Sequence, residues 1–382
     1  MSVSRSMAAV HARPYDTDVC VAGGGPAGLA AAIACAQRGL SVTVVDAARP
    51  PLDKACGEGL MPNALSALAG LGVTVDAAEA APFAGIRVIG SDKRAEACFT
   101  RGTGYGIRRT VLHDLLRVRA EELGVQMDWG TRITGLDGDV LALDARRIRA
   151  RWIVGADGLQ SRIRRWAGLD HGRVLSRRIG LRRHYGMAPW SRFVEIYWSD
   201  HAQAYVTPVG PEQVCVVITI TAKRPASFQD ALREMPELED RLAGAPCTSA
   251  ARGAVTLGRR LRRRTRGPVA LVGDASGSVD SITGEGLSIG FHQATPLAEA
   301  IVANDLSRYE RASRKITRVP LFMSQTMLLL DRSVLLRRHT LAAFARSPQL
   351  FARMLRVHVE ESPLQWLGDE GVLQLGWELL TA

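Results

Sequence analysis

The sequence predicts an α/β protein in which a Rossmann-like dinucleotide-binding domain is interleaved with an antiparallel-sheet domain and followed by C-terminal helices. Three distant segments carry this prediction: residues 19–32, 153–164 and 270–286. In each of them a short apolar run, typical of a buried strand, leads into a turn that contains glycine. A fold that surrounds one extended dinucleotide with separate loops has this organisation.

The first segment places a G-x-G-x-x-G turn between a predicted strand at 18–22 and a predicted helix at 27–38. Gly23 permits the tight turn, Gly25 lets the backbone approach a pyrophosphate, and Gly28 lets helix and strand pack closely. Because all three elements occur in this order, we interpret the turn as a ligand site and not as a glycine-rich turn without a ligand.

The start of this predicted helix favours an anion. Pro26 and Ala27 lie in its first turn, where unpaired N–H groups and the helix dipole attract phosphate. Asp46 ends the next predicted strand and follows Gly28 by 18 positions. That spacing is close to the roughly 20 positions expected for the acid that binds a ribose hydroxyl.

Composition excludes several classes of protein. No uncharged apolar stretch of about 18 residues is present, so no transmembrane helix is predicted. The polar residues 1–15 are interpreted as a disordered lead-in and not as a signal peptide. Six cysteines without C-x-x-C pairs predict no metal site and no disulfide framework, and they indicate a reducing, cytoplasmic setting.

The net charge of +11 comes almost wholly from arginine. No nucleic-acid-binding motif accompanies it, so we predict no nucleic-acid partner. The positive charge could instead attract anionic ligands, or it could support a peripheral contact with an acidic membrane surface. Oligomeric state is not predicted.

The chain divides into three predicted regions. The dinucleotide-binding domain is discontinuous, a substrate-binding sheet domain is inserted into it, and a helical region follows. Their predicted limits are 16–80, 105–172 and 260–310 for the first, 81–104 and 173–259 for the second, and 311–382 for the third.

Over residues 16–311 the three segments resemble the flavoprotein superfamily of p-hydroxybenzoate hydroxylase. The resemblance implies FAD as cofactor, NAD(P)H as electron donor without a separate nicotinamide domain, and a dinucleotide-binding domain of the glutathione-reductase type. It implies that Asp157 and Gly158 of the G-A-D-G motif lie beside the flavin, and that Asp274 after Gly273 binds the ribitol.

The same resemblance places Arg109, which heads the R-x-x-L-x-x-x-L helix start, near FAD; a solvated arginine is the alternative. The T-G-E-G segment opens a further helix, whose N–H groups could stabilise negative charge on the flavin. Gly284 and Gly286 would permit the close backbone approach.

Two segments resemble the geranylgeranyl reductase branch of this superfamily. They are D-K-A-C-G-E-G-L-M-P at 53–62 and G-D-A-S-G-S-V-D-S-I-T-G-E-G at 273–286. Ser276 replaces the histidine of the hydroxylases, and Ser281 stands where the reductase branch expects proline. These departures concern the chemical step and not the flavin. The W-x-W-x-I-P motif of flavin halogenases is absent from the sequence.

Four residues are candidates for catalysis. Cys56 could be a redox or positioning thiol, or a packed apolar residue. Glu58 and Glu285 could be polar groups beside the flavin, or solvated turn residues. His201 could deprotonate a phenol, or lie in a surface turn.

Substrate is expected between the flavin and the sheet predicted over 177–221, which carries Tyr197, Trp198 and Tyr205 as candidates or as packing residues. The arginine-rich run at 259–266 has three interpretations: a dinucleotide-phosphate site, a membrane-facing patch, or a solvated loop.

We therefore expect an FAD-dependent oxidoreductase with a small hydrophobic substrate. The favoured hypothesis is an NAD(P)H-dependent monooxygenase that hydroxylates an aromatic or polyketide-like metabolite. The alternative is a flavin-dependent reductase of isoprenoid-like double bonds. A non-catalytic flavin carrier or sensor is the third.

Overall fold

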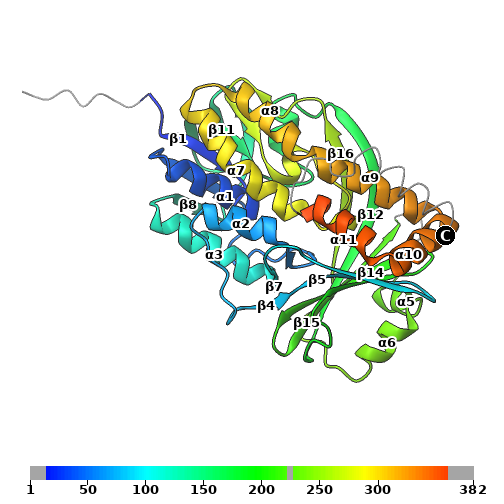
Figure 1. Ribbon diagram of the computed structural model, residues 1–382. Helices are drawn as coiled ribbons and strands as arrows, with labels where there is room; N and C mark the ends of the chain where they lie inside the picture. The colour runs from blue at the N-terminus through cyan, green and yellow to red at the C-terminus, as the bar shows by residue number, and fades with distance from the viewer. Residues whose placement is uncertain (1–13, 222–226, 360–382) are drawn as a thin grey trace, which may run out of the picture.

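The computed structural model describes residues 14–221 and 227–359. The predicted lead-in at 1–13 and the end of the predicted helical region, 360–382, lie outside these ranges. Within them the chain forms a mixed α/β fold on an eight-stranded, a seven-stranded and a three-stranded sheet (Figure 1).

Parallel strands form the centre of the eight-stranded sheet, in the order β18–β11–β1–β2–β8. They span Val269–Leu271, Arg147–Gly155, Thr17–Ala22, Val42–Asp46 and Gln126–Trp129. An apolar run such as that of β1 is typical of a parallel strand covered on both faces. Cys20 on β1 and Cys35 on α1 are fully buried, as expected for small core residues, and burial raises both thiol pKa values to about 12.

Helices cover one face of this sheet and a hairpin with a short helix covers the other. The helices are α1 (Pro26–Ala36), α2 (Pro62–Gly70), α3 (Arg109–Glu122), α7 (Gly286–Val302) and α8 (Leu306–Ile316). The second layer contains β9 (Ile133–Asp137), β10 (Val140–Leu143) and α4 (Arg162–Trp166). The edge strand β17 (Thr265–Arg266) runs antiparallel to β18.

The seven-stranded sheet has the order β16–β12–β15–β14–β13–β5–β6. Its strands are Arg252–Leu261, Gly172–Tyr185, Gln213–Thr221, Ala202–Gly210, Val194–Trp198, Gly85–Ile89 and Arg94–Cys98. The sheet is not wholly antiparallel as predicted, because β5 pairs with β13 in parallel. β5 reaches the sheet from a distant part of the chain and is not connected to β13 by a hairpin.

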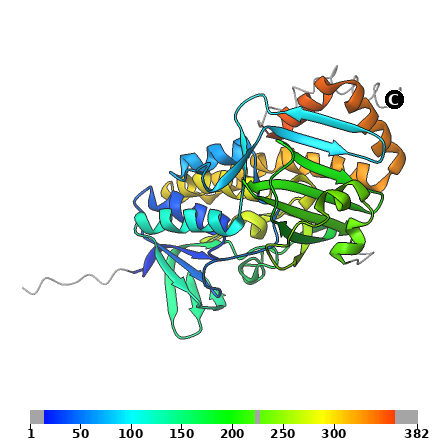
Figure 2. The ribbon, with the colours of Figure 1, turned by 90° about the horizontal axis from the view of Figure 1, so that it is seen from below.

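Helices flank the seven-stranded sheet on both faces (Figure 2). One face packs against α5 (Phe228–Leu232) and α6 (Pro236–Leu242), the other against α10 (Val334–Arg346) and α11 (Pro348–Val359). α5 and α6 are separate helices, because Pro236 cannot donate a backbone hydrogen bond and disfavours helical conformation at the preceding Met235.

The small third sheet was not anticipated. It consists of β3 (Gly59–Leu60), β7 (Gly104–Ile107) and β4 (Ala80–Phe83), and it lies against β14. Two of the predicted domain limits, after residues 80 and 104, fall inside β4 and β7. The division into domains therefore stays a prediction.

The C-terminal region is helical as far as it is described, and α9 (Arg318–Arg332) connects α8 to α10. Among the described helices none is by itself long and apolar enough to cross a membrane. Leu306–Arg332 and Val334–Arg346 together meet the length and composition criteria, with a bend of 116° between them. Peripheral membrane contact stays a prediction.

Candidate active site

One cavity of about 1060 Å³ is lined by residues of all three glycine-containing segments, by the seven-stranded sheet and by the C-terminal helices. Ligand pockets are typically about 300–1,000 Å³. The cavity therefore has room for a large cofactor together with part of a second molecule.

The first segment forms the turn that its glycines predict. Gly23 has φ 112°, and a Cβ on Gly28 would lie 1.9 Å from the carbonyl oxygen of Gly23, so neither position accepts a side chain without a backbone shift. The Asp46 carboxylate accepts a 2.7 Å hydrogen bond from the Gly24 N–H and holds the turn against β2. The structure thus brings Asp46 beside the turn.

The N-terminus of α1 faces the cavity. Gly25 is its N-cap and supplies no side chain for the first N–H groups; Gly25, Pro26 and Ala27 all line the cavity. A Cβ on Gly25 would have no atom within 4 Å. This helix end therefore offers unpaired donors and open space to an anion.

Helix α3 contacts this turn. Arg109, its first residue, lines the cavity, and its Nε is buried with no hydrogen-bond partner in the described chain. His113, one turn further on, is buried, and its Nε2 lies 2.9 Å from the Gly24 carbonyl oxygen. Because a carbonyl oxygen only accepts, Nε2 donates this hydrogen bond to the turn.

Burial lowers the pKa of His113 below its ordinary value, and the hydrogen bond to Gly24 only partly opposes this. An unfolded histidine takes up its proton below about pH 6.5, whereas folded His113 stays neutral to lower pH. The unfolded state then binds more protons, so acidification through this window lowers the free energy of unfolding.

We expect His113→Gln, which retains a donor for Gly24, to reduce this loss of stability. The measurement is denaturant unfolding of wild type and variant at several pH values from neutral to mildly acidic. The same dependence on pH in both proteins would exclude His113 as a source of acid sensitivity.

The second segment uses its aspartate to hold a helix. Asp157 accepts hydrogen bonds from the backbone N–H of Arg162 at 2.6 Å, from that of Ile163 at 3.1 Å and from the Ser161 hydroxyl at 2.5 Å. Asp157 and Gly158 both line the cavity. Because the carboxylate is occupied by the start of α4, its contribution is to shape the cavity wall.

A buried arginine joins the second segment to the third. Arg164 is 1% exposed; its Nε donates to Asp170 at 2.7 Å and its Nη1 to the Ala275 carbonyl oxygen at 3.2 Å. Two motifs more than a hundred residues apart in sequence are thereby held in register on the cavity wall.

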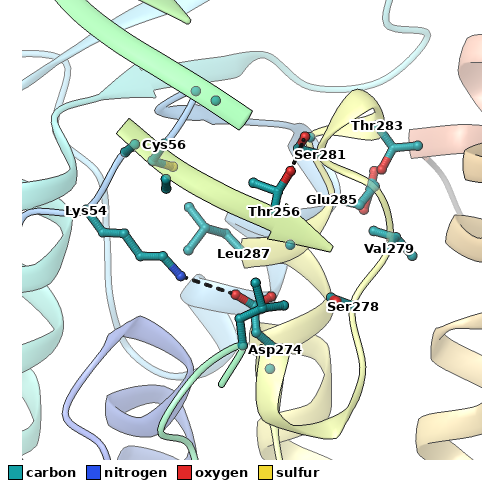
Figure 3. Close-up of a pocket in the computed structure, with 18 of the residues that line it drawn as sticks. Lys54, Cys56, Thr256, Asp274, Ser278, Val279, Ser281, Thr283, Glu285 and Leu287 are labelled. Carbon is teal, nitrogen blue, oxygen red and sulfur yellow. Dashed lines mark hydrogen bonds and ion pairs between the residues drawn. The ribbon is translucent and has the colours of Figure 1, made fainter. Parts of the chain in front are cut away.

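The third segment continues directly from β18 and lines the cavity, and Figure 3 shows several of its residues. Asp274, which follows Gly273, points toward Lys54, and the Lys54 Nζ lies 3.5 Å from Asp274 Oδ2. Gly284 has φ 69°, and Gly286 begins α7; both line the cavity. This wall presents an ion pair and a second helix N-terminus.

The four catalytic candidates occupy different environments. Cys56 is half-buried and lines the cavity. Glu285 is buried at the start of α7, with Oε1 3.3 Å from Nε2 of His358. His201 does not line the cavity: it is exposed in the turn between β13 and β14, where its backbone N–H donates to the Ser199 hydroxyl oxygen. The structure therefore supports the surface-turn interpretation of His201.

Glu58 lines the cavity but is itself fully buried and belongs to an ion-pair network. Its carboxylate lies 2.7 Å from His184 Nε2 and 3.2 Å from Arg182 Nη1, and it accepts the Arg109 N–H at 3.0 Å. The Arg182 guanidinium also binds Asp53 and lowers the pKa of that carboxyl. Glu58 is thus occupied in holding α3 and the sheet together.

Glu58, His184 and Cys215 could geometrically form a metal site, since their ligand atoms lie within 4.8 Å of one another. Two observations argue against a cation there. The Arg182 guanidinium already supplies positive charge, and burial raises the pKa of Cys215 well above its usual value, so the thiol keeps its proton.

Of the sheet aromatics, Trp198 and Tyr205 line the cavity. The Tyr205 hydroxyl has two acceptors within hydrogen-bond distance, Gln203 Oε1 at 2.7 Å and the Ile282 carbonyl oxygen, directly before the T-G-E-G turn, at 3.0 Å. Tyr197 packs instead in the core beneath α5 and α6, where its hydroxyl donates to Glu195.

The arginine-rich run at 259–266 is not a single patch. Arg259 pairs with Asp170 at 3.0 Å, while Arg264 is 5% exposed and lies beside Glu310. Burial lowers the pKa of Arg264. The interpretation as one solvated loop is therefore wrong for its buried member, and these two arginines hold β16 and β17 to neighbouring elements.

Among the cavity residues that were missed are Lys54, Arg337 and His358. Lys54 lies within the motif that contains Cys56, so its position there could have drawn attention to it. Arg337 on α10 and His358 on α11 also line the cavity. Their helices carry no motif, so nothing local indicates that they reach the site.

The arrangement fits FAD. The uncapped start of α1 suits its pyrophosphate, Asp46 its ribose, and the unpartnered Nε of Arg109 supplies a further donor to an acceptor. The Lys54–Asp274 pair and the N-terminus of α7 lie on the same cavity wall. These features define the class of protein as a flavin-dependent oxidoreductase.

Comparison with known proteins agrees. The family described as FAD binding domain matches residues 16–306, so the chain belongs to this family. It is 28% identical over 320 residues to menaquinone reductase of Mycobacterium tuberculosis, covering 76% of this chain and 78% of that protein. It is 30% identical over 295 residues to digeranylgeranylglycerophospholipid reductase 1 of Methanopyrus kandleri, covering 71% and 76%.

Solved structures share the fold. A flavoprotein/dehydrogenase of Cytophaga hutchinsonii has a TM-score of 0.77 at 18% identity, covering 90% of this chain and 92% of that chain. A 2-methyl-3-hydroxypyridine-5-carboxylic acid oxygenase has a TM-score of 0.70 at 24% identity, covering 82% and 92%. The resemblance to the p-hydroxybenzoate hydroxylase superfamily, with features of the geranylgeranyl reductase branch, is confirmed.

Proposed function

We propose that this protein is a flavin-dependent reductase of carbon–carbon double bonds in an isoprenoid-like substrate, with NAD(P)H as electron donor and a dinucleotide-binding domain of the glutathione-reductase type. One observation carries the proposal most strongly. The three glycine-containing segments that would hold FAD are called the flavin cradle. Beyond it, the cavity is also lined by apolar side chains of the C-terminal helices: Met323, Met327, Leu330, Leu341, Phe344, Phe351, Met354 and Leu355. The similarity to two reductases over about three quarters of the chain supports the same choice.

When bound, FAD supplies hydride transfer between the nicotinamide and the substrate. The chain's own residues bind the cofactor, exclude water with the apolar lining, and supply a proton. Saturation of an alkene adds one hydride and one proton, so a proton donor is required on the cavity wall. Cys56 lines that wall, and the His358–Glu285 pair holds a second exchangeable proton there.

Hydroxylation of an aromatic or polyketide-like metabolite is the second candidate, and the superfamily motifs alone favour it. The specific observation for it is the His358–Glu285 pair, since a phenol is activated by losing its proton to a base such as histidine. Monooxygenase chemistry needs oxygen, whereas alkene reduction does not.

We expect the reduced protein to reduce one double bond of farnesol in the absence of oxygen, giving a product heavier by two hydrogen atoms in mass spectrometry. Reduction without oxygen would support the reductase. A product that forms only with oxygen, from a phenolic probe and heavier by one oxygen atom, would favour hydroxylation instead.

We expect Cys56→Ser to lower the rate of alkene reduction by about 100-fold or more while the FAD content stays that of wild type, since a missing proton donor typically costs this factor. Cys98→Ser, at an exposed position outside the cavity lining, is the matched control. An unchanged rate in Cys56→Ser would assign the proton to another group.

A further inference from the structure

The part of the cavity that is lined by apolar side chains of α9, α10 and α11, here called the apolar arm, also contains an arginine. Arg337 on α10 lines the cavity although it is only 6% exposed. Among the described lining residues of α9, α10 and α11, it and His358 are the ionisable ones, and His358 is paired with Glu285. Charged side chains are rarely this buried unless a partner compensates them.

The partner of Arg337 satisfies only one side of the guanidinium. Its Nη2 donates to Asp200 Oδ1 at 2.5 Å, but Asp200 is 56% exposed. Water screens that carboxylate, so it offsets the buried positive charge only in part. The other terminal nitrogen, Nη1, is buried and has no hydrogen-bond partner in the described chain.

The indole N–H of Trp198, near the Arg337 guanidinium, is also a buried donor without a hydrogen-bond partner among the described residues. The Arg337 guanidinium lies 5.6 Å from the centre of the Trp198 ring, and Trp198 also lines the cavity. The indole Nε1 of Trp198 is buried and likewise lacks a partner among the described residues. Buried polar groups in folded proteins are nearly always hydrogen-bonded, so two neighbouring donors without a partner indicate a missing acceptor.

We propose that Arg337 and Trp198 bind a carboxylate at the end of an otherwise apolar substrate. A carboxylate offers acceptors to both donors and compensates the remaining charge of the guanidinium through charge-assisted hydrogen bonds. The methionine, leucine and phenylalanine side chains of the arm bind the apolar body. This inference rests on the proposed function only in taking the arm as the substrate site.

Binding of simple probes tests the proposal without any catalysis. The FAD-loaded protein is titrated calorimetrically with decanoate, and separately with methyl decanoate, which has the same chain without the charge. We expect decanoate to bind about tenfold or more tightly than its ester. Equal affinity of the two probes would overturn the proposal.

Substitutions show which side chains bind decanoate. We expect Arg337→Gln to weaken decanoate binding about tenfold or more and to leave the ester unaffected. Arg337→Lys, which keeps the charge and a donor for Asp200, should restore part of the affinity; Trp198→Phe should weaken decanoate binding without removing the charge. Arg338→Gln, at the exposed neighbouring position on α10, is the matched control.

The outcomes separate the two hypotheses. Should Arg337→Gln bind decanoate like wild type at unchanged FAD content, the carboxylate site is wrong whatever reaction the protein catalyses. If decanoate binds through Arg337 but no alkene is reduced, the reductase proposal is wrong and the carboxylate site stands.

Discussion

Substitution of Gly25 by aspartate is expected to remove FAD from the protein while leaving the chain folded. Gly25 caps α1 with ordinary backbone angles, φ −69° and ψ 173°, and a Cβ there meets no atom within 4 Å. The new carboxylate would lie at the anion-binding end of the helix. Two like charges about 4 Å apart repel by about 4 kcal/mol at an effective dielectric of 20, so we expect FAD affinity to fall by a factor of about 100 or more.

The measurement is the FAD content of the purified variant, followed by titration of the apoprotein with FAD by flavin fluorescence. Gly70→Ala is the matched control, because its Cβ is also unobstructed and the residue lies in α2, outside the cavity lining. Retention of FAD by Gly25→Asp at wild-type affinity would show that the pyrophosphate does not bind at α1.

The flavin cradle could be predicted because its requirements are local. The clash that Gly28 avoids involves Gly23, five residues earlier, and the strand–turn–helix sequence around them is continuous. Asp46 lies at the end of the neighbouring parallel strand, so chain order alone places it beside the turn. Such features depend little on how distant elements pack.

The cavity residues on the C-terminal helices, where we propose that substrate binds, could not be predicted from local sequence. Arg337 and His358 reach the cavity only because α10 and α11 pack against β6 and the apolar face of the seven-stranded sheet, and no local pattern fixes that packing. For His201 the sequence left a catalytic base and a surface-turn residue as alternatives, and the turn between β13 and β14 exposes the residue to solvent. Residue type indicated chemistry at that position, and tertiary structure decided against it.

For Glu58, a local motif predicted its place beside the flavin, but only tertiary packing determined its partners. Its motif marked it as a polar group beside the flavin, but its partners Arg182 and His184 are 124 and 126 residues away in sequence. They lie on β12, which the sequence predicted only as part of the sheet over 177–221. The carboxylate therefore turned out to connect the Cys56 loop, α3 and the sheet.

Replacement of Glu58 by alanine is expected to lower the free energy of unfolding by about 3–5 kcal/mol, the cost of leaving buried charges without a partner. Arg182 would keep Asp53, whereas His184 and the Arg109 N–H would lose the acceptor that they share. Denaturant unfolding of the FAD-free proteins measures the loss. Glu299→Gln, which breaks an ion pair whose acid is 62% exposed, is the control and should cost about 1 kcal/mol or less.

Glycine at the same position separates the lost charge from backbone strain. Glu58 has φ 59°, a left-handed conformation that costs a non-glycine residue roughly 1–2 kcal/mol. Glu58→Gly removes the same carboxylate but relieves that strain, so it should be more stable than Glu58→Ala by about 1 kcal/mol. If instead both variants unfold like wild type, the buried network does not stabilise the fold. Glu58 would then be free for the catalytic role that its place on the cavity wall permits.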